Sequence, residues 1–316
     1  MSYRPLRAVS VVLAAILGGM TSNAAVPGQQ VPVFRGGVDL VNVAVTVTDR
    51  KSNLVSDLTV DDFEIFEDGK KQTPRYFSAG LNTGPGDPPM HLGLLLDVSE
   101  SMGEDIAFTK TAAVRFLNTL TEAVDITFVD FDTEIRATRY SQADFARVIE
   151  RIRLQKTSGW TALYDAIGVY LDGADRQDGR KVMLLYTDGG DTRSALTLNN
   201  LIDLLKASDV TVYAIGALEH QSASTKNEQR MVLQQIADVT GGQAFFPLSV
   251  KDLDHMYEKV AAEIRAQYTI GYVSTNEKTD GAWRKVEIKA VRKDGRDFRV
   301  RSRRGYYGPA KPTAKQ

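Results

Sequence analysis

Strand and helix patterns alternate along the middle of the chain, and this alternation limits the folds that the chain can adopt. His91–Leu96 and Val182–Tyr186 are short apolar runs of the kind found in strands buried on both faces. Apolar residues at helical spacing follow the first run, over Ala107–Leu120. Further helices are predicted at Phe145–Leu154, Ala162–Leu171, Leu196–Ala207, Met231–Val239 and Leu253–Ala266, and further strands at Ile126–Phe131, near Ile135, at Val210–Ile215 and at Ala244–Phe246. The alternation predicts a doubly wound α/β fold over residues 90–265, with a mostly parallel sheet and helices on both of its faces.

Two β-rich segments flank this region, at residues 33–82 and 267–308. In the first, valine occupies every second position from Val41 to Val47, which is typical of a half-buried strand. Further strands are predicted at Phe63–Glu67, which the turn pair Asp68–Gly69 closes, at Arg75–Phe77, at Tyr268–Val273 and, on either side of a turn at Asp294–Gly295, at Arg284–Val291 and Phe298–Ser302. About three strands on each side are few for independent stability. We therefore expect the two segments to form one β-sandwich, with the α/β region inserted between them after the Gly- and Pro-rich linker Asn82–Pro89.

The first residues have the features of an export signal. Arg4 and Arg7 precede an apolar run from Ala8 to Met20, and small residues follow at Ser22–Ala24. We interpret residues 1–24 as a signal peptide, and the alternative is an uncleaved N-terminal anchor. The apolar run is short for a bilayer span, which takes about 20 residues, and no later apolar run reaches that length. The mature protein is expected to be periplasmic or secreted, with no membrane span.

The composition excludes several classes of function. The chain contains no cysteine, so it has no disulfide framework, no thiolate metal site and no cysteine nucleophile. Its 39 Lys and Arg residues balance 40 Asp and Glu residues, which gives no reason to expect binding to nucleic acid through bulk charge. Arg301, Arg303 and Arg304 form a basic run near the end, which we interpret as a solvated strand face rather than an anion site.

Three clusters of oxygen-bearing residues follow or precede the predicted elements of the α/β region. Asp97–Ser101 (DVSES) directly follows the first buried strand, and Thr187–Asp191 (TDGGD) directly follows another. Thr157–Thr161 (TSGWT) lies just before a helix. Loops at the carboxyl ends of parallel strands share one edge of a doubly wound sheet. Asp97 and Asp188 should therefore face each other across a crevice at this edge.

The candidate ligands in these clusters are the carboxylates of Asp97 and Asp188 and the hydroxyls of Ser99, Ser101 and Thr161. Hard oxygen donors suit Mg²⁺, Mn²⁺ or Ca²⁺ and do not suit Zn²⁺ or Cu²⁺. Hydroxyls carry no charge, and the two carboxylates could act largely through water. The metal would then keep much of its positive charge and attract a carboxylate from outside. The alternative is that Asp97 and Asp188 only cap the helices that follow them.

Other acidic residues near the clusters are assigned to other roles. Glu100 and Asp191 are interpreted as solvated loop carboxylates, which is the commonest state of such residues. Asp130 and Asp132 end a neighbouring strand and are left outside the site. The predicted metal ligands are therefore limited to the two aspartates and the three hydroxyl residues.

The three clusters also resemble a known family. D-x-S-x-S at Asp97–Ser101, T-A-L-Y-D-A-I at Thr161–Ile167 and T-D-G at Thr187–Gly189 are similar to the metal ion-dependent adhesion site of von Willebrand factor type A domains. The resemblance covers roughly residues 90–265. It implies that Ser99, Ser101 and Thr161 bind the metal directly, and that Asp97 and Asp188 bind through water or change between direct and water-mediated contact. Trp160 departs from the pattern, since a glycine often precedes the threonine.

The flanking segments extend this resemblance. Asp61–Phe63, Glu67–Gly69 and Arg304–Tyr307 resemble parts of exported bacterial proteins related to von Willebrand factor A. For these proteins the resemblance implies no particular partner.

A binding module is favoured over an enzyme. His91, His220 and His255 lie outside the three clusters, and the chain contains no G-x-S-x-G, dinucleotide-binding or P-loop motif. We expect a non-enzymatic adhesion or assembly module whose metal accepts an Asp or Glu carboxylate from a protein partner. The alternatives are a structural cell-envelope protein with a stabilising metal and, less favoured, a metal-assisted hydrolase. The sequence does not indicate an oligomeric state.

Overall fold

A computed structural model describes residues 40–81, 88–292 and 298–310 of the chain. The predicted signal peptide at 1–24, positions 33–39 and 82–87, the turn at Asp294–Gly295 and the end of the chain from Lys311 lie outside the described residues. In the described ranges, no helix is long and apolar enough to span a membrane.

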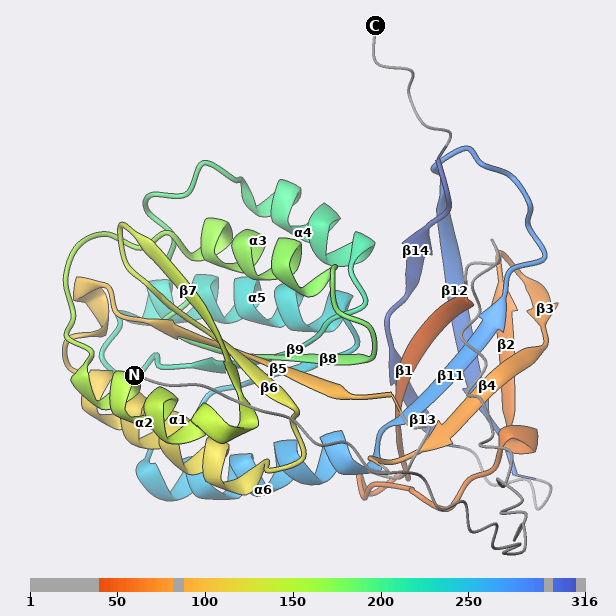
Figure 1. The fold of residues 1–316 in the computed structure, drawn as a ribbon, viewed down its shortest axis with the longest axis horizontal. Helices are drawn as coiled ribbons and strands as arrows, with labels where there is room; N and C mark the ends of the chain where they lie inside the picture. The colour runs from red at the N-terminus through yellow and green to blue at the C-terminus, as the bar shows by residue number, and fades with distance from the viewer. Residues whose placement is uncertain (1–39, 82–87, 293–297, 311–316) are drawn as a thin grey trace, which may run out of the picture. The chain divides into compact units, whose positions relative to one another are not determined.

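The α/β region contains a six-stranded sheet in the order β10-β9-β8-β5-β6-β7 (Figure 1). Its strands are β5 (Met90–Asp97), β6 (Asp125–Phe131), β7 (Ile135–Ser141), β8 (Arg180–Thr187), β9 (Thr211–Gly216) and β10 (Gln243–Phe245). Neighbouring strands are parallel except for β6 and β7, which are antiparallel. The strand order reverses at β5, because β6 lies on one side of it and β8 on the other. Ligands of doubly wound sheets commonly bind at such a reversal, beyond the carboxyl ends of the strands.

Helices cover both faces of this sheet. They are α1 (Ile106–Thr119), α2 (Phe145–Leu154), α3 (Leu163–Ala174), α4 (Leu198–Ala207), α5 (Ala223–Val239) and α6 (Val250–Ala266), with short 3₁₀ turns at Val60–Asp62, Glu100–Met102 and Gln142–Asp144. One core lies between the sheet and α1, α2 and α6, and a second lies between the sheet and α3, α4 and α5 (Figure 1). In β5, Leu94 belongs to the first core and Leu95 to the second. The strand is therefore apolar at consecutive positions, and the predicted α/β fold is confirmed.

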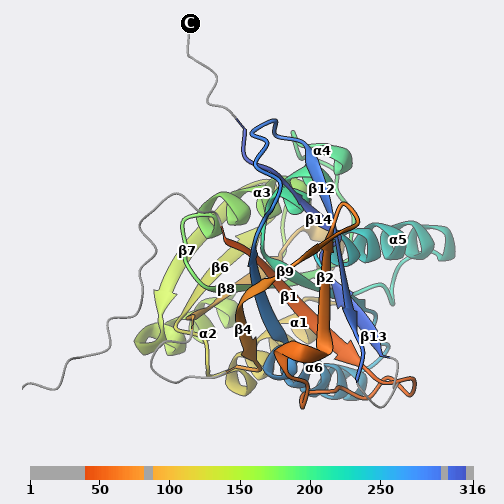
Figure 2. The same cartoon turned by 90° about the vertical axis from the view of Figure 1, so that its right-hand side faces the viewer.

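The flanking segments form two four-stranded antiparallel sheets, in the orders β13-β1-β11-β4 and β14-β12-β2-β3 (Figure 2). Their strands are β1 (Leu40–Thr48), β2 (Phe63–Glu67), β3 (Lys70–Gln72), β4 (Pro74–Ala79), β11 (Tyr268–Val273), β12 (Trp283–Ala290), β13 (Arg299–Ser302) and β14 (Gly305–Tyr307). Val43, Ile65, Tyr268 and Val286 come from four different strands and share one buried core. Each sheet combines strands from both ends of the chain, so the predicted β-sandwich is confirmed.

Three details of the prediction differ from the structure. Each flank contributes four strands rather than about three, because β3 and β14 were missed. Both strands are only three residues long, which is too short to show an alternating pattern. Helix α5 begins at Ala223 and not at Met231. Its first two turns are polar, and Ser222 caps them by accepting a hydrogen bond from the Thr225 N–H at 3.3 Å.

A buried carboxylate ties the sandwich together. Glu67, the last residue of β2, is 2% exposed and accepts hydrogen bonds from the hydroxyls of Tyr272 (2.9 Å), Tyr306 (2.8 Å) and Ser274 (2.5 Å). The guanidinium of Arg284, also 2% exposed, lies 3.8 Å from the carboxylate. Burial, followed by the bond to Glu67, raises the pKa of Tyr272, which therefore stays protonated and continues to donate.

The basic run near the end was wrongly predicted to be a solvated face. Arg301 is half-buried, donates to the Gly241 carbonyl (2.9 Å) and forms an ion pair with Glu263 of α6. Arg303 donates to the Ser208 carbonyl (3.2 Å), and burial lowers its pKa. Only Arg304 is exposed. The strand face was misread because the surface that covers it comes from the α/β region, which is distant in the sequence.

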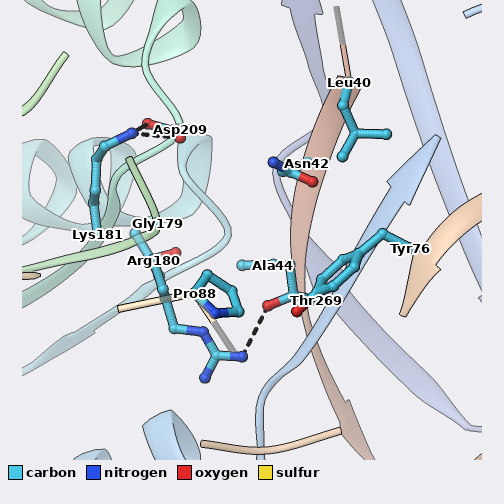
Figure 3. A pocket seen from close by; sticks show the side chains of 11 residues that line it. Leu40, Asn42, Ala44, Tyr76, Pro88, Gly179, Arg180, Lys181, Asp209 and Thr269 are labelled. Atoms are coloured by element: carbon cyan, nitrogen blue, oxygen red, sulfur yellow. Dashed lines mark hydrogen bonds and ion pairs between the residues drawn. The ribbon is translucent and has the colours of Figure 1, made fainter. Parts of the chain in front are cut away.

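Arg180, the first residue of β8, joins the α/β sheet to the sandwich. It is 9% exposed and donates to the carbonyls of Ile264 (3.3 Å), Gly80 (3.2 Å) and Gln267 (3.1 Å) and to the Thr269 hydroxyl (2.8 Å). A cavity of about 250 Å³ lies beside it, and the ion pair between Lys181 and Asp209 lines the same cavity (Figure 3). A single guanidinium therefore satisfies several buried acceptors where the chain passes between the two regions.

Replacement of Arg180 by methionine is expected to lower the free energy of unfolding by about 2 kcal/mol, because the buried carbonyls lose a charged donor. Urea unfolding followed by circular dichroism measures this change. The control is Arg176→Met, since Arg176 is 76% exposed and pairs with Asp172, which is 74% exposed. Equal unfolding midpoints for the two variants would contradict the assigned role of Arg180.

Candidate metal site at the carboxyl edge of the sheet

The predicted site residues lie where two central strands of the α/β sheet end. Asp97 is the last residue of β5 and Thr187 the last residue of β8, and these strands are parallel neighbours. Asp188 follows Thr187 directly. Asp97 is completely buried and Asp188 is 2% exposed. The apolar strands therefore place two carboxylates side by side at the buried edge of the sheet, as the sequence predicted.

Asp97 organises the loop that follows β5. Its Oδ1 accepts hydrogen bonds from the backbone N–H of Ser99 (2.9 Å) and from the Ser99 hydroxyl (2.6 Å), and its Oδ2 accepts from the Thr187 hydroxyl (2.6 Å). The Ser99 Oγ lies 3.1 Å from the Ser101 Oγ. Ser99 is completely buried and Ser101 is exposed. A continuous row of oxygen atoms thus runs from the buried aspartate to the surface.

Asp188 and Thr161 approach the end of this row from the other two loops. Asp188 Oδ1 accepts from the Gly190 N–H (2.9 Å), and its Oδ2 accepts from the side-chain amide of Gln221 (3.0 Å). Thr161 is 4% exposed. Its N–H donates to the Thr192 hydroxyl (3.0 Å), and its carbonyl accepts from the Thr192 N–H (2.9 Å). These bonds hold the loop before α3 against the loop after β8.

The interpretation of Asp97 and Asp188 as helix caps is wrong. Each side chain bonds to a backbone N–H two residues further along its own loop. The residue at the start of α1 is Asp105, and α4 is capped by Thr197. The two aspartates therefore shape the loops, and neither satisfies the first N–H groups of a helix.

One cavity of about 380 Å³ brings the three loops together. It is lined by Glu100, Ser101, Gly159, Trp160, Thr161, Asp188, Gly190, Thr192, Gln221 and Gln229. Three of the predicted ligands, Ser101, Thr161 and Asp188, face this cavity, and the other two connect to it through the bond between Ser99 and Ser101. The structure therefore gathers all five predicted residues in one place.

The electrostatics of the site are dominated by negative charge. Burial, and then the charge of Asp188, raise the pKa of Asp97 from its usual 3.8 to about 7, although hydrogen bonds from Ser99 and Thr187 act in the opposite direction. Of the described residues that line the cavity, none is Lys, Arg or His. A cation bound here would supply the positive charge that the protein itself does not place beside these carboxylates.

The amino-acid sequence of this region matches a known family. The model of the von Willebrand factor type A domain (VWA) matches residues 91–259, which is more than half of the 316 residues. The chain belongs to the von Willebrand factor type A domain family. The match covers β5 to most of α6, so the site lies entirely within the VWA domain.

Solved structures similar to this VWA protein include a mutant of the PilB minor pilin from Streptococcus sanguinis, which is 11% identical with a TM-score of 0.47 over 58% of this chain and 63% of that chain. A von Willebrand factor type A protein from Catenulispora acidiphila is 15% identical, with a TM-score of 0.47 over 78% and 73% of the two chains. The vWF domain of the type V pili tip protein Mfa5 from Porphyromonas gingivalis is 13% identical, with a TM-score of 0.45 over 61% and 99%. The chain thus spans less than two thirds of the first of these proteins. The search of curated proteins finds no match.

The donor set of this VWA site fits a hard divalent cation. It offers two carboxylates and three hydroxyls, and Mg²⁺, Mn²⁺ and Ca²⁺ prefer oxygen ligands. In the described ranges, no group of three or more His, Cys, Asp or Glu residues gathers in a geometry suited to a metal. The described residues therefore form no metal site that is rich in carboxylates, histidines or cysteines. A cation that keeps part of its water shell needs fewer protein carboxylates.

Several acidic residues around the site have structural partners. Asp191 was predicted to be a solvated loop carboxylate, but its Oδ1 accepts from the Tyr164 N–H at the start of α3 (3.2 Å) and from the Ser194 hydroxyl of its own loop (2.6 Å). Glu100 is exposed, as predicted. Asp130 and Asp132 pair with Arg136, and neither lines the cavity. Sequence spacing could not reveal the bond from Tyr164, because Tyr164 belongs to α3 and is distant in the sequence.

Other residues that shape the site were missed by the sequence prediction. Gln221 holds Asp188, and no local pattern identifies an isolated glutamine in a loop as functional. Asp165 accepts from the N–H groups of Ala195 (2.8 Å) and Leu196 (2.9 Å), and so fixes the loop after β8 to α3. Asp165 is the aspartate of the T-A-L-Y-D-A-I motif, so a signal was present, but it was not linked to a role.

Proposed function

We propose that the VWA domain binds a hard divalent cation, with Mg²⁺ the expected ion and Mn²⁺ or Ca²⁺ able to replace it. Asp97, Ser99, Ser101, Thr161 and Asp188 would hold the ion, and a protein partner would complete the site with an Asp or Glu carboxylate. The observation that carries this proposal is the row of oxygens from Asp97 to Ser101, which ends in a cavity shared with Thr161 and Asp188.

The two kinds of ligand would have different roles. Ser101, Thr161 and Asp188 face the cavity, whereas Asp97 and Ser99 are completely buried behind it. Both carboxylate oxygens of Asp97 already accept hydrogen bonds from Ser99 and Thr187. Asp97 is thus suited to offset part of the charge of the ion and to orient the Ser99 hydroxyl. The hydroxyls of the ligand set would contact the ion. An ion held mainly by neutral oxygens remains attractive to an external carboxylate.

The proposed role is adhesion or assembly and requires no enzymatic residue. None of the three histidines lines the cavity. His91 contacts Asp125 and the Asp178 carbonyl, His220 contacts Asp105, and His255 is exposed on α6. A metal–carboxylate contact alone rarely gives high affinity, so a surrounding protein surface would supply the remainder. With export of the mature chain to the periplasm or beyond, the partner would be a cell-envelope or extracellular protein.

Capture from cell-envelope extracts tests this function. Immobilised wild-type protein is expected to retain a partner in Mg²⁺ and to lose it in EDTA. The Asp97→Ala variant is expected to retain none in either buffer, because its cation site lacks the central carboxylate. The matched control is Asp172→Asn, a change at an aspartate that is 74% exposed and distant from the site.

Two results would contradict the proposal. Partners retained equally in Mg²⁺ and EDTA would instead support a structural cell-envelope protein with a stabilising metal. Hydrolysis of ester or phosphoester substrates that Ser99→Ala abolishes would support a metal-assisted hydrolase.

A further inference from the structure

The loop that carries Trp160 is held firmly by backbone hydrogen bonds. The Trp160 N–H donates to the Thr133 hydroxyl (2.8 Å), and the Gly159 carbonyl accepts from the Glu100 N–H (3.1 Å). Gly159 has a φ of +71°, and a Cβ added there would lie 2.6 Å from the Thr133 Oγ1. Only glycine fits this close approach without strain. The backbone on the N-terminal side of Trp160 therefore has one defined conformation.

The neighbouring residues of the loop are held in the same way. The Ser158 N–H donates to the Val98 carbonyl (2.9 Å), and the Ala162 N–H donates to the Asp132 carbonyl (2.9 Å). With the bond from Thr161 to Thr192, each residue from Ser158 to Ala162 takes part in a hydrogen bond to another segment. The loop is thus preorganised before any partner binds.

This ordered loop presents a large apolar side chain to solvent. Trp160 is 66% exposed, yet it lines the cavity that contains Ser101, Thr161 and Asp188. The exposure of the Trp160 side chain does not result from a loose backbone, because hydrogen bonds hold the backbone on both sides of Trp160. Tryptophan is one of the residue types enriched among interface residues that dominate binding energy. An indole held rigidly beside the proposed ligand position is therefore suited to contact whatever flanks the partner's carboxylate.

The charge beside Trp160 indicates the chemistry of that flanking group. Glu100 is exposed, lines the same cavity and is joined by its backbone to Gly159, the residue before Trp160. Apart from Asp188, it is the only charged residue among the described residues of the lining. A carboxylate and the face of an indole both attract cations. An acidic flanking residue would instead be repelled by Glu100.

We infer that Trp160 and Glu100 form a cation-accepting rim, so that the partner segment presents a Lys or Arg beside the carboxylate that the metal site receives. This inference rests on the proposed function, because it describes the segment bound at that site. Trp160 and Glu100 would determine specificity, whereas Asp97, Ser99, Ser101, Thr161 and Asp188 would hold the ion. The replacement of the usual glycine by Trp160 then has a role in selecting the partner.

Three surface-coupled peptides at matched density provide the test: acetyl-Gly-Lys-Asp-Gly, acetyl-Gly-Gly-Asp-Gly and acetyl-Gly-Leu-Asp-Gly. In Mg²⁺ the wild-type protein is expected to bind the Lys peptide about tenfold more tightly than the Gly peptide, from one exposed cation–π contact and one exposed ion pair. Trp160→Ala and Glu100→Gln are each expected to reduce this preference to about two- to threefold. Both variants should bind the Gly peptide and Mg²⁺ as the wild type does, which a general structural defect would not allow.

A fluorescence measurement reports contact with the indole directly. The chain has two tryptophans, so Trp283→Phe leaves Trp160 as the only indole. The substitution keeps an aromatic ring against Tyr307, whose ring centre lies 5.1 Å from that of Trp283. Titration with the soluble Lys peptide in Mg²⁺ is expected to change the Trp160 emission. The matched control for surface binding is Leu154→Ala, because Leu154 is 72% exposed at the end of α2.

The outcomes separate this inference from the proposed function. Equal binding of the Lys and Gly peptides by the wild type, lost in EDTA, would overturn the cation-accepting rim and leave the metal site standing. Stronger binding of the Leu peptide would also overturn it, by assigning the rim to an apolar side chain. Binding of all three peptides that EDTA does not change would contradict the proposed function and the inference together.

Discussion

Metal-free Asp97→Asn protein is expected to unfold at a higher temperature than metal-free wild type at pH 8, and Mg²⁺ is expected to narrow this difference. Burial and the charge of Asp188 raise the pKa of Asp97 to about 7, so its ionised form is unfavourable in the folded protein. The raised pKa corresponds to a cost on the order of 4 kcal/mol at pH 8. Asparagine removes this cost and still accepts a hydrogen bond from Ser99. With Mg²⁺ the wild type gains about 3 kcal/mol at one hundred times the dissociation constant, and the variant gains little.

The stability of the metal-free wild type depends on pH in a definite direction. The pKa of Asp97 is higher in the folded protein than the ordinary value of 3.8 that it regains on unfolding. The folded state therefore binds more protons than the unfolded state between these two values, and the wild type loses stability as the pH rises from about 4 through about 7. The stability of Asp97→Asn lacks this dependence on pH, because asparagine does not ionise in this range. In EDTA, the difference between the melting temperatures of the two proteins should grow from pH 5 to pH 8.

Differential scanning calorimetry in EDTA and in Mg²⁺ measures both effects. Asp172→Asn is the control for a loss of one negative charge at an exposed position. An equal rise in the melting temperature of wild type and Asp97→Asn on addition of Mg²⁺ would place the stabilising ion elsewhere. Equal melting temperatures at pH 8 in EDTA would show that burial of Asp97 is not costly.

Replacement of Glu67 by alanine is expected to lower the free energy of unfolding of the sandwich by about 3 kcal/mol. Glu67 lies between the two sheets and accepts three hydroxyl donors, with the buried guanidinium of Arg284 beside it. Its removal leaves a buried cation and the hydroxyls of Tyr272 and Tyr306 without their acceptor, and breaking a buried ion pair on one side only is among the most destabilising changes. The contact between Tyr306 and Glu67 also gives a physical reason for the two flanking motifs to occur together.

Urea unfolding of Glu67→Ala and Glu64→Ala provides a matched comparison on one strand. Glu64 is 44% exposed and pairs with Lys71, which is 64% exposed. Exposed ion pairs contribute little, so Glu64→Ala is expected to leave the free energy of unfolding nearly unchanged. The role assigned to Glu67 fails if the two variants unfold at the same urea concentration. A double variant, Glu67→Leu with Arg284→Met, is expected to recover part of the loss because no unpaired charge remains buried.

The α/β architecture and the candidate site could be predicted because their determinants are local. The apolar run before Asp97 marks β5 as a strand buried on both faces, and the run before Asp188 marks β8 in the same way. Parallel strands in such a sheet end at a common edge, so their following residues must meet. Ser99 and Ser101 lie within four residues of Asp97. The contacts of Ser99 with Asp97 and of Ser101 with Ser99 depend only on a tight loop.

The errors of the prediction concern residues whose environment comes from elsewhere in the chain. The sequence pattern predicts that Arg301 is exposed, yet the three-dimensional structure places Glu263 and Gly241 against it. Asp191 was read as a solvated carboxylate, but α3 brings the Tyr164 N–H to it. In both cases the side chain is charged, and charged side chains are usually exposed. Its burial is therefore visible only when a distant segment is placed over it.

The sequence by itself determined which strands are buried, where their polar ends fall and which oxygen atoms stand there, because these properties follow from patterns of a few residues. The tertiary structure decided which groups surround them. It placed Gln221 on Asp188, Trp160 and Glu100 on the rim of one cavity, and Arg180 between the α/β sheet and the sandwich. Long-range neighbours depend on how helices and sheets pack, and a hydrogen bond between distant residues leaves no periodic signal in the chain.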